Sequence, residues 1–472
     1  MSLSSKANIA FNWLYSLGFF VGLGFCFLYA QNQILTGDQT QMLYKGYLGV
    51  YQGTWLNFGN AASAVGNVPG SLSTWLIGGP LLIWDSPWSP MVLLFAIRVV
   101  SLYLLDSVIK DTFEGEYCKL ARLLFLALYW LNPWFLYDSM LYNPSYLCLF
   151  AAMHLWSAMK MRDHKSFGYT FIHVLSIGLA MQLHYSWPIL AVISAYLLYR
   201  KMGHVSWIGA IVAVIVLVAS LIPYLQELAV NDSISRESDR YIGYGLVHVY
   251  PVLKALLYWL RYGSMLFSNK VIAYGEFDWL TNIEWLKITV LSLWKTLIFL
   301  IGGISVVASA RLNWLFWKRI KPIIRTSSSP LNSVQWIELY AFGAVVGVLI
   351  SAALSPITFS YWHLIMVYPF AILPILSGIL RFLTEKPQVE NRSIAAETRL
   401  TRFVGRYSVT RKVSDVFTDT HKLRLMLVAS FGYLLVLNIL ASQDSLKYSY
   451  QSDYVSQVKN YLHQEQLLPK GQ

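Results

Sequence analysis

The sequence predicts an all-α polytopic membrane protein with about eleven transmembrane helices and with amphipathic helices in two long outer loops. Of its 472 residues, 56% are hydrophobic and only 13% are charged, and the mean hydropathy is +0.49. A soluble chain carries roughly twice this share of charged residues to cover its core. The apolar residues also gather in runs of about 20, the length that crosses a bilayer. These observations exclude a soluble enzyme.

Eleven apolar runs are candidate spans. The run at 188–199 is short, and the first run follows a lone Lys6, as in a signal peptide. Leu28 makes a cleavage site after Ala30 unfavourable, so we interpret the first run as a span. The predicted spans are residues 11–30, 91–109, 120–137, 142–159, 168–187, 188–199, 207–226, 288–310, 336–358, 362–380 and 423–441.

The positive charges indicate the orientation. Most of the 36 Lys and Arg residues fall in segments that this span order places on one side, namely 110–122, 160–165, 200–201, 311–325 and 381–424. Short loops rich in Lys and Arg stay in the cytoplasm, so we expect a cytoplasmic amino terminus in a multi-pass protein of the bacterial inner membrane. The net charge of +12 then reflects topology, and no nucleic-acid partner is expected.

Four regions follow from this order. Residues 1–380 form a transmembrane catalytic module with outer loops at about 31–90 and 227–287, in which an amphipathic helix at 251–266 is expected to lie in the headgroup plane. Residues 381–422 are a basic cytoplasmic linker, 423–443 the last transmembrane helix and 444–472 a short outer tail. The three cysteines suggest neither a disulfide framework nor a metal cluster.

Two carboxylates are the candidate catalytic residues. Asp38 opens a helical stretch just beyond the first span, and Asp138 lies in a turn of about five residues between two spans, so both are expected at the outer surface. Acids beside apolar spans usually mark a site. Asp38 as a helix N-cap and Asp138 as a solvated turn residue are the alternative interpretations.

Other polar residues are candidate ligands for a substrate. Arg98 interrupts the second span, where a charge costs roughly 2.5 to 3.5 kcal/mol unless it is paired. His184 and His363 each lie at the outer end of a predicted span, His184 with Tyr185 and His363 with Tyr361. The full set of predicted substrate-binding residues is Tyr44, Lys45, Arg98, Asn143, His184, Tyr185, Arg236, Arg240, Tyr361 and His363.

The order of these features resembles a known superfamily. An Asp follows the first span, the outer loop ends in NVPGSLSTWLIGGPLLIW, RVVSLYLLD lies in the second span, and LYWLNPWFLYDSMLYNPSYL and YWHLIMVYPFAILPIL follow. This pattern resembles the GT-C polytopic membrane glycosyltransferases, the group of protein O-mannosyltransferases and lipid A aminoarabinose transferases, over about residues 10–380.

The resemblance implies a fold and an activity. It implies a polyprenyl-phosphate sugar donor, Asp38 as catalytic carboxylate and Asp138 as the second one, and His363 stands where many relatives carry an Arg. The family's Asp-Glu pair is Asp38-Gln39 here, and its Lys-Pro-Pro is reduced to Val68-Pro69-Gly70, which removes a phosphate-binding Lys. No cofactor is certain, although the carboxylates suit a divalent metal.

Physical chemistry supports the same chemistry. A polyprenyl-phosphate donor keeps its tail in the bilayer, so its sugar must react where outer loops meet span ends. Inverting transfer needs a carboxylate for the acceptor hydroxyl and cations for the phosphate leaving group, for which Arg98, Arg236 and Arg240 are candidates. The acceptor is a lipid, glycan or protein hydroxyl, in cell-envelope, lipopolysaccharide or other glycan biosynthesis.

Three alternatives remain open. A secondary transporter fits the number of spans, but no internal repeat or centrally broken helix is found. A lipid-linked polysaccharide polymerase or ligase fits the chemistry, but the early Asp38 argues against it. A non-catalytic membrane scaffold is the third, and it predicts that both acids are dispensable.

Overall fold

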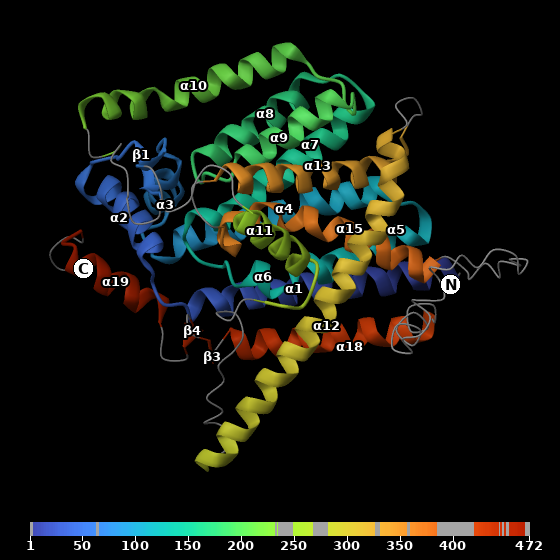
Figure 1. Cartoon of the computed structure of the whole chain (residues 1–472). Helices are drawn as coiled ribbons and strands as arrows, with labels where there is room; N and C mark the ends of the chain where they lie inside the picture. Colours follow the sequence, from blue (N-terminus) through green and yellow to red (C-terminus); the bar gives the residue numbers. More distant parts are fainter. Residues whose placement is uncertain are drawn as a thin grey trace, which may run out of the picture.

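A computed structural model shows that the described part of the chain is helical apart from two short hairpins (Figure 1). This confirms the all-α class. The structure describes residues 3–62, 66–231, 234, 249–267, 282–325, 331–355, 359–384, 420–442, 444–445, 448–449 and 453–467.

Seven helices in the described part of the chain are long and apolar enough to cross a membrane, as a multi-pass membrane protein requires. Each corresponds to a predicted span. They are α1 (Leu3–Gln31), α4 (Trp88–Thr112), α10 (Trp207–Val230), α12 (Glu284–Arg325), α13 (Ser333–Leu354), the run of α14 (Tyr361–Leu364), η4 (Ile365–Val367) and α15 (Tyr368–Thr384), and α18 (Thr420–Ala441).

The other four predicted spans form shorter helices, so the count of eleven is not confirmed. They are α5 (Gly115–Phe125) with the π-helix η1 (Leu126–Trp130), α7 (Leu147–Asp163), α8 (Phe167–Met181) and α9 (Pro188–Tyr199). Among these helices, α7 packs against α4 and α8, and α9 packs against α13. Most of α7 is buried, whereas Tyr117 of α5, Phe167 of α8 and Tyr199 of α9 are exposed.

Contacts at one end of the bundle join the segments that were predicted to be cytoplasmic. Lys160 Nζ lies 2.6 Å from a carboxylate oxygen of Asp111, the Arg200 guanidinium donates to the carbonyl of Ile324, and Arg162 donates to Ser333. The amino terminus lies at this end in Figure 1. The basic segments therefore do share one side of the bundle, as the span order requires.

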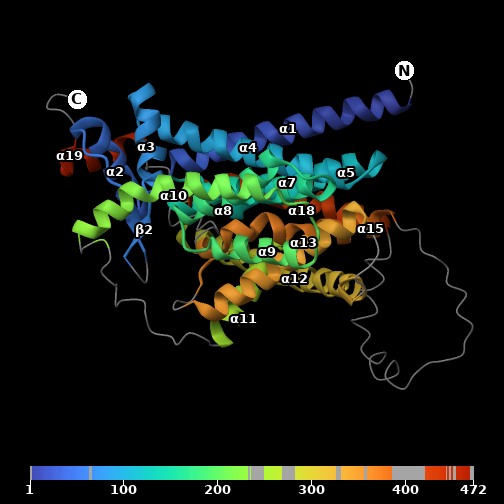
Figure 2. The ribbon, with the colours of Figure 1, turned by 90° about the horizontal axis from the view of Figure 1, so that it is seen from above.

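The opposite end, which we call the α2 end, carries the small elements. In Figures 1 and 2, α2, α3 and α19 lie together there. Gly46 allows α2 to approach α3 closely, because a Cβ there would lie 2.5 Å from Ile77. The elements are α2 (Gly37–Gln52), β1 (Phe58–Ala61) paired antiparallel with β2 (Asn67–Pro69), α3 (Leu72–Ile83), β3 (Asp444–Ser445) paired antiparallel with β4 (Tyr448–Ser449), and α19 (Tyr454–Gln464).

Helix α11 (Val249–Tyr262) confirms the amphipathic helix predicted in the second outer loop, with slightly earlier ends. Pro251, Ala255 and Trp259 are buried on one face, which packs against α12, α13 and α15. Leu253 and Leu257 are exposed on the other face. The predicted linker at 381–422 lies mostly outside the described residues, which resume at α18.

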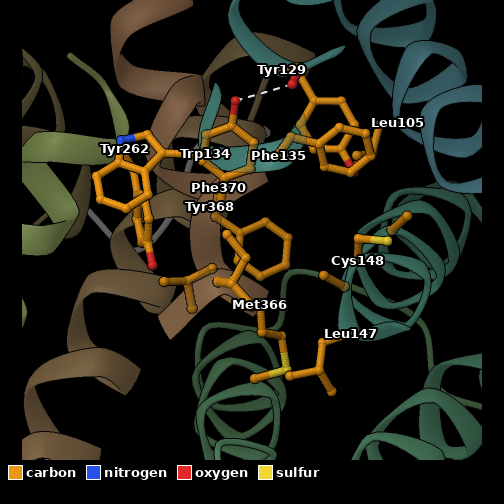
Figure 3. Close-up of a cluster of buried hydrophobic side chains, with 14 of the residues drawn as sticks. Leu105, Tyr129, Trp134, Phe135, Leu147, Cys148, Tyr262, Met366, Tyr368 and Phe370 are labelled. Atoms are coloured by element: carbon orange, nitrogen blue, oxygen red, sulfur yellow. Dashed lines mark hydrogen bonds between the residues drawn. The ribbon is translucent and has the colours of Figure 1, made fainter. Parts of the chain in front are cut away.

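The centre of the bundle is a continuous aromatic core. Every residue from 129 to 148 is buried, although this segment includes only the short helices α6 (Pro133–Leu136) and η2 (Asn143–Tyr146). The Tyr368 hydroxyl donates to the carbonyl of Tyr129, and the two rings stack with centroids 5.5 Å apart (Figure 3). Irregular backbone at this depth needs protein partners, because lipid offers none.

Candidate functional site

Asp38 lies in the first turn of α2 and is exposed. It is not the N-cap, because that position is Thr36, whose backbone N–H donates to Gln39 Oε1 at 2.9 Å in a capping box. The capping interpretation of Asp38 is therefore wrong. Asp38 therefore lies exposed in the first turn of α2, where the helix dipole favours an acidic side chain, without serving as the cap.

Lys45 lies two turns further along α2 and is only 5% exposed. Its Nζ donates to Asn60 Oδ1 at 3.1 Å and lies 5.4 Å from the centroid of the Phe58 ring. Burial lowers the pKa of Lys45 to about 7. An ammonium group has three donors, and the described residues accept from one of them, so this lysine suits a small anion.

Asn60 connects this lysine to Asp38. While its Oδ1 accepts from Lys45, its Nδ2 donates to the backbone carbonyl of Asp38 at 2.9 Å. Next to it, the N–H of Ala61 donates to Gln41 at 2.9 Å, so β1 is attached to α2 at two points. The segment that contains α2 and β1 therefore carries an exposed carboxylate and a buried amine that are connected through Asn60.

Asp138 is 2% exposed, so it lies below the surface and is not a solvated turn residue. Its Oδ1 accepts from the hydroxyl of Tyr142 at 2.6 Å, and its backbone carbonyl accepts from Ser145 at 2.6 Å. The predicted turn of five residues is wrong: the break between helices runs from Leu131 to Tyr146. Asn132 caps α6 and Pro133 occupies its first position, which begins the irregular segment.

Arg98 is 1% exposed and supports this segment from α4. Its guanidinium donates to the carbonyl of Asp138 at 2.9 Å and to the carbonyl of Phe135, and it stacks on the Phe135 ring at 3.7 Å. Both of these hydrogen-bond acceptors are backbone oxygens, where the sequence led us to expect an anion. Arg98 holds the Asp138 segment in shape.

Hydrogen bonds link the segments that carry the two acids. The Gln39 amide donates to Gln33 Oε1, and Gln33 Nε2 donates to the carbonyl of Ser139 at 3.3 Å. Gln39 and Ser139 directly follow Asp38 and Asp138 in the chain, and both glutamines are buried. The two carboxylates therefore belong to one connected region at the α2 end, one on the surface and one beneath it.

His184 and His363 form a pair, with ring centroids 5.6 Å apart. The N–H of Ser186 donates to Nδ1 of His184 at 3.2 Å, and that of Ser360 donates to Nδ1 of His363 at 2.8 Å. Burial lowers the pKa of His184 to about 4, so this ring is neutral. An accepting Nδ1 assigns the proton of each neutral ring to Nε2, so the pair presents two N–H donors.

The remaining predicted ligands divide between these groups. Asn143 donates to the carbonyl of Leu183 at 2.9 Å, beside His184, and Tyr185 donates to the carbonyl of Asn67 in β2 at 3.3 Å. Tyr361 is buried with its ring 5.9 Å from that of Tyr137, and Tyr44 is half-buried on α2. Arg236 and Arg240 lie outside the described residues.

Among the residues that the structure describes, no three His, Cys, Asp or Glu side chains lie together as a metal site would require. The metal expected at the carboxylates remains a prediction.

Sequence reasoning missed three residues of this region. Asn60, Gln33 and Tyr142 carry the contacts that connect the candidate groups. Gln33 and Gln39 stand in a conspicuously glutamine-rich stretch, QNQILTGDQTQ, which was the available signal. Nothing local in the sequence marks Asn60, because its role depends on the pairing of β1 with α2.

A scan against models of protein families finds no match to this chain, and a search of curated proteins finds none. Among solved structures, the chain is similar to the crystal structure of ArnT from Cupriavidus metallidurans bound to undecaprenyl phosphate. The similarity covers 98% of this chain and 78% of that chain, with 12% sequence identity and a TM-score of 0.46.

Proposed function

We propose that this protein is a membrane glycosyltransferase that moves a sugar from a polyprenyl-phosphate donor to a hydroxyl of a lipid, glycan or protein acceptor. The proposal depends on one observation: Asn60 accepts from the buried amine of Lys45 and donates to the backbone carbonyl of Asp38, whose carboxylate is exposed at the α2 end. A carboxylate can take a proton from an acceptor hydroxyl, and an ammonium can stabilise a phosphate leaving group.

The positions of the two groups suit an in-line transfer. Seven residues along a helix bring the side chains back to the same face, about 10 Å apart along the axis. A sugar ring and the acceptor hydroxyl fit between a phosphate at Lys45 and a proton acceptor at Asp38. Attack from the side opposite the phosphate inverts the anomeric configuration, so we propose an inverting reaction.

Other residues complete the proposed site. Asp138 accepts from Tyr142 beneath the surface and serves as the second carboxylate, holding a sugar hydroxyl or the Asp38 segment. The Nε2 donors of His184 and His363 bind oxygen atoms of the substrate. Arg98 acts through the backbone of the Asp138 segment, as a positioning residue.

We further propose that the α2 end faces the periplasm and that the amino terminus is cytoplasmic. The basic segments at the other end support this orientation through the positive-inside rule. A donor anchored in the outer leaflet by its polyprenyl tail then presents its sugar to Asp38 at the membrane surface.

The test is sugar transfer from a synthetic polyprenyl-phosphate sugar by protein in nanodiscs. Asp38→Asn keeps the size of the side chain and leaves the Thr36 cap intact, so we expect turnover to fall about 100-fold or more with unchanged thermal stability. Asp138→Asn should impair transfer as well. Asp163→Asn is the matched control, because Asp163 is an exposed acid at the far end of α7. Transfer by Asp38→Asn protein at the wild-type rate would contradict the proposal.

A further inference from the structure

The carboxy-terminal helix α19 packs against the connection between α1 and α2, although it lies more than 400 residues away in the chain (Figures 1 and 2). Tyr454, Val458 and Leu462 recur every four residues and are each at most 1% exposed, so they form the buried stripe of the helix. The Tyr454 hydroxyl also donates to the carbonyl of Pro87 at 3.0 Å. The tail is thus part of the packed structure of the α2 end.

Gln457 binds the backbone on the amino-terminal side of Asp38. Its Oε1 accepts from the N–H of Leu35 at 3.0 Å, and its Nε2 donates to the carbonyl of Gln33 at 2.7 Å. The chain between α1 and α2 makes no helical hydrogen bonds there, so its backbone groups need other partners. The side-chain amide of Gln457 supplies both an acceptor for the N–H of Leu35 and a donor for the carbonyl of Gln33.

Tyr461, one turn further along α19, binds on the other side of Asp38. Its hydroxyl donates to the carbonyl of Thr40 at 3.2 Å. Asp453, the N-cap of α19, accepts a hydrogen bond of 3.1 Å from Gln31 at the end of α1. Helix α19 therefore binds the backbone three and five residues before Asp38 and two residues after it.

We infer that α19 is a positioning element for Asp38, with Gln457 and Tyr461 as positioning residues that act through the backbone. This inference depends on the proposed function for its kinetic part. Gln457 fixes where α2 begins, and Tyr461 fixes its first turn. Because rates of positioned reactions are sensitive to shifts of about 1 Å, loosening this segment should lower turnover more than it alters donor binding.

The experiment compares Gln457→Ala with Gln464→Ala, which alters an exposed glutamine on the same helix. Hydrogen exchange measured by mass spectrometry follows the amides of residues 33–40, and transfer kinetics give kcat and the donor KM. We expect Gln457→Ala to speed exchange in this segment and to lower kcat about 10-fold at unchanged KM, while Gln464→Ala behaves as wild type. Tyr461→Phe, which removes one hydroxyl, repeats the test if Gln457→Ala does not fold.

Two results would overturn the inference. Unchanged exchange in both Gln457→Ala and Tyr461→Phe means that α19 does not hold the segment. Faster exchange with kcat and KM equal to those of Gln464→Ala means that the segment is held but that its position is irrelevant to transfer. If the wild-type protein transfers no sugar, the proposed function fails, and the exchange measurement alone decides whether α19 fixes the segment that carries Asp38.

Discussion

Binding of the donor should weaken as the pH rises through about 7, because the proposed phosphate ligand loses its charge in that range. Lys45 has a pKa of about 7 as a result of burial, and α3 and β1, which pack on α2, contain no charged residue. A group with this pKa is about 90% protonated at pH 6 and about 10% at pH 8. If the phosphate binds only the ammonium form, the affinity falls roughly 9-fold between these pH values, or about 1.3 kcal/mol.

Lys45→Met should remove this pH dependence and weaken binding at pH 6, while it makes the protein more stable. The folded-state pKa of Lys45 lies below its ordinary value of 10.5, so burial of the charge destabilises the folded protein. This cost is complete below about pH 7 and disappears as the pH rises to about 10.5. Its upper bound is on the order of 5 kcal/mol. A variant that gains stability and loses ligand identifies a residue kept for function.

The assay is calorimetric titration of protein in nanodiscs with a synthetic polyprenyl-phosphate sugar at pH 6, 7 and 8. A phosphodiester donor keeps a single charge over this range, so the change in affinity reports on the protein. Lys110→Met, at an exposed lysine on the end of α4, is the control and should follow the wild type. An equal pH dependence in Lys45→Met and wild type, or a wild-type affinity that does not vary with pH, would refute the assignment of Lys45.

Two further predictions concern the scaffold and its orientation. Arg98→Ala should destabilise the protein by roughly 3 to 5 kcal/mol, measured by unfolding in detergent, because two buried carbonyls of the Asp138 segment each lose a charged donor and keep at least one other. Arg311→Ala, at an exposed arginine of α12, should have little effect, and equal stability of the two variants would argue against this role. Topology is tested with single cysteines in a background without the three native cysteines. A cysteine at position 184 should react with a membrane-impermeant reagent from outside, whereas one at position 318 should react only after permeabilisation. The reverse result would mean that the topology is inverted.

Hydropathy was sufficient for the seven long helices. A span that faces lipid must be apolar over its whole length, so a continuous run of residues in the sequence is enough to identify it. Helices α10 and α12 show it most clearly, since only 11% of the apolar window of each is buried. Most of the surface of these two helices is not covered by protein and must suit the bilayer. No tertiary information was therefore needed to predict them.

Hydropathy did not predict the helix ends correctly where the chain is surrounded by protein rather than by lipid. The predicted spans at 120–137 and 142–159 end or begin inside the irregular segment from Leu131 to Tyr146, in which polar residues and two Asn-Pro pairs are mixed with aromatic residues and leucines. The helix can break there because Arg98 donates to a carbonyl of this segment and Tyr368 donates to the carbonyls of Leu128 and Tyr129 just before it. Those donors come from distant parts of the chain, and a local pattern does not reveal them.

Some features of the candidate site likewise follow from the sequence, and others follow only from the tertiary structure. The sequence by itself determined that Asp38 stands just beyond an apolar span in a long polar-aromatic loop, and that a charged Arg98 inside a span needs partners. Only the tertiary structure decided that Asn60 joins Lys45 to the backbone of Asp38, and that Gln457 of the tail binds the backbone beside this carboxylate. The physical reason is that hydropathy and capping depend on neighbours in the chain, whereas a hydrogen bond between remote segments depends on how the helices pack.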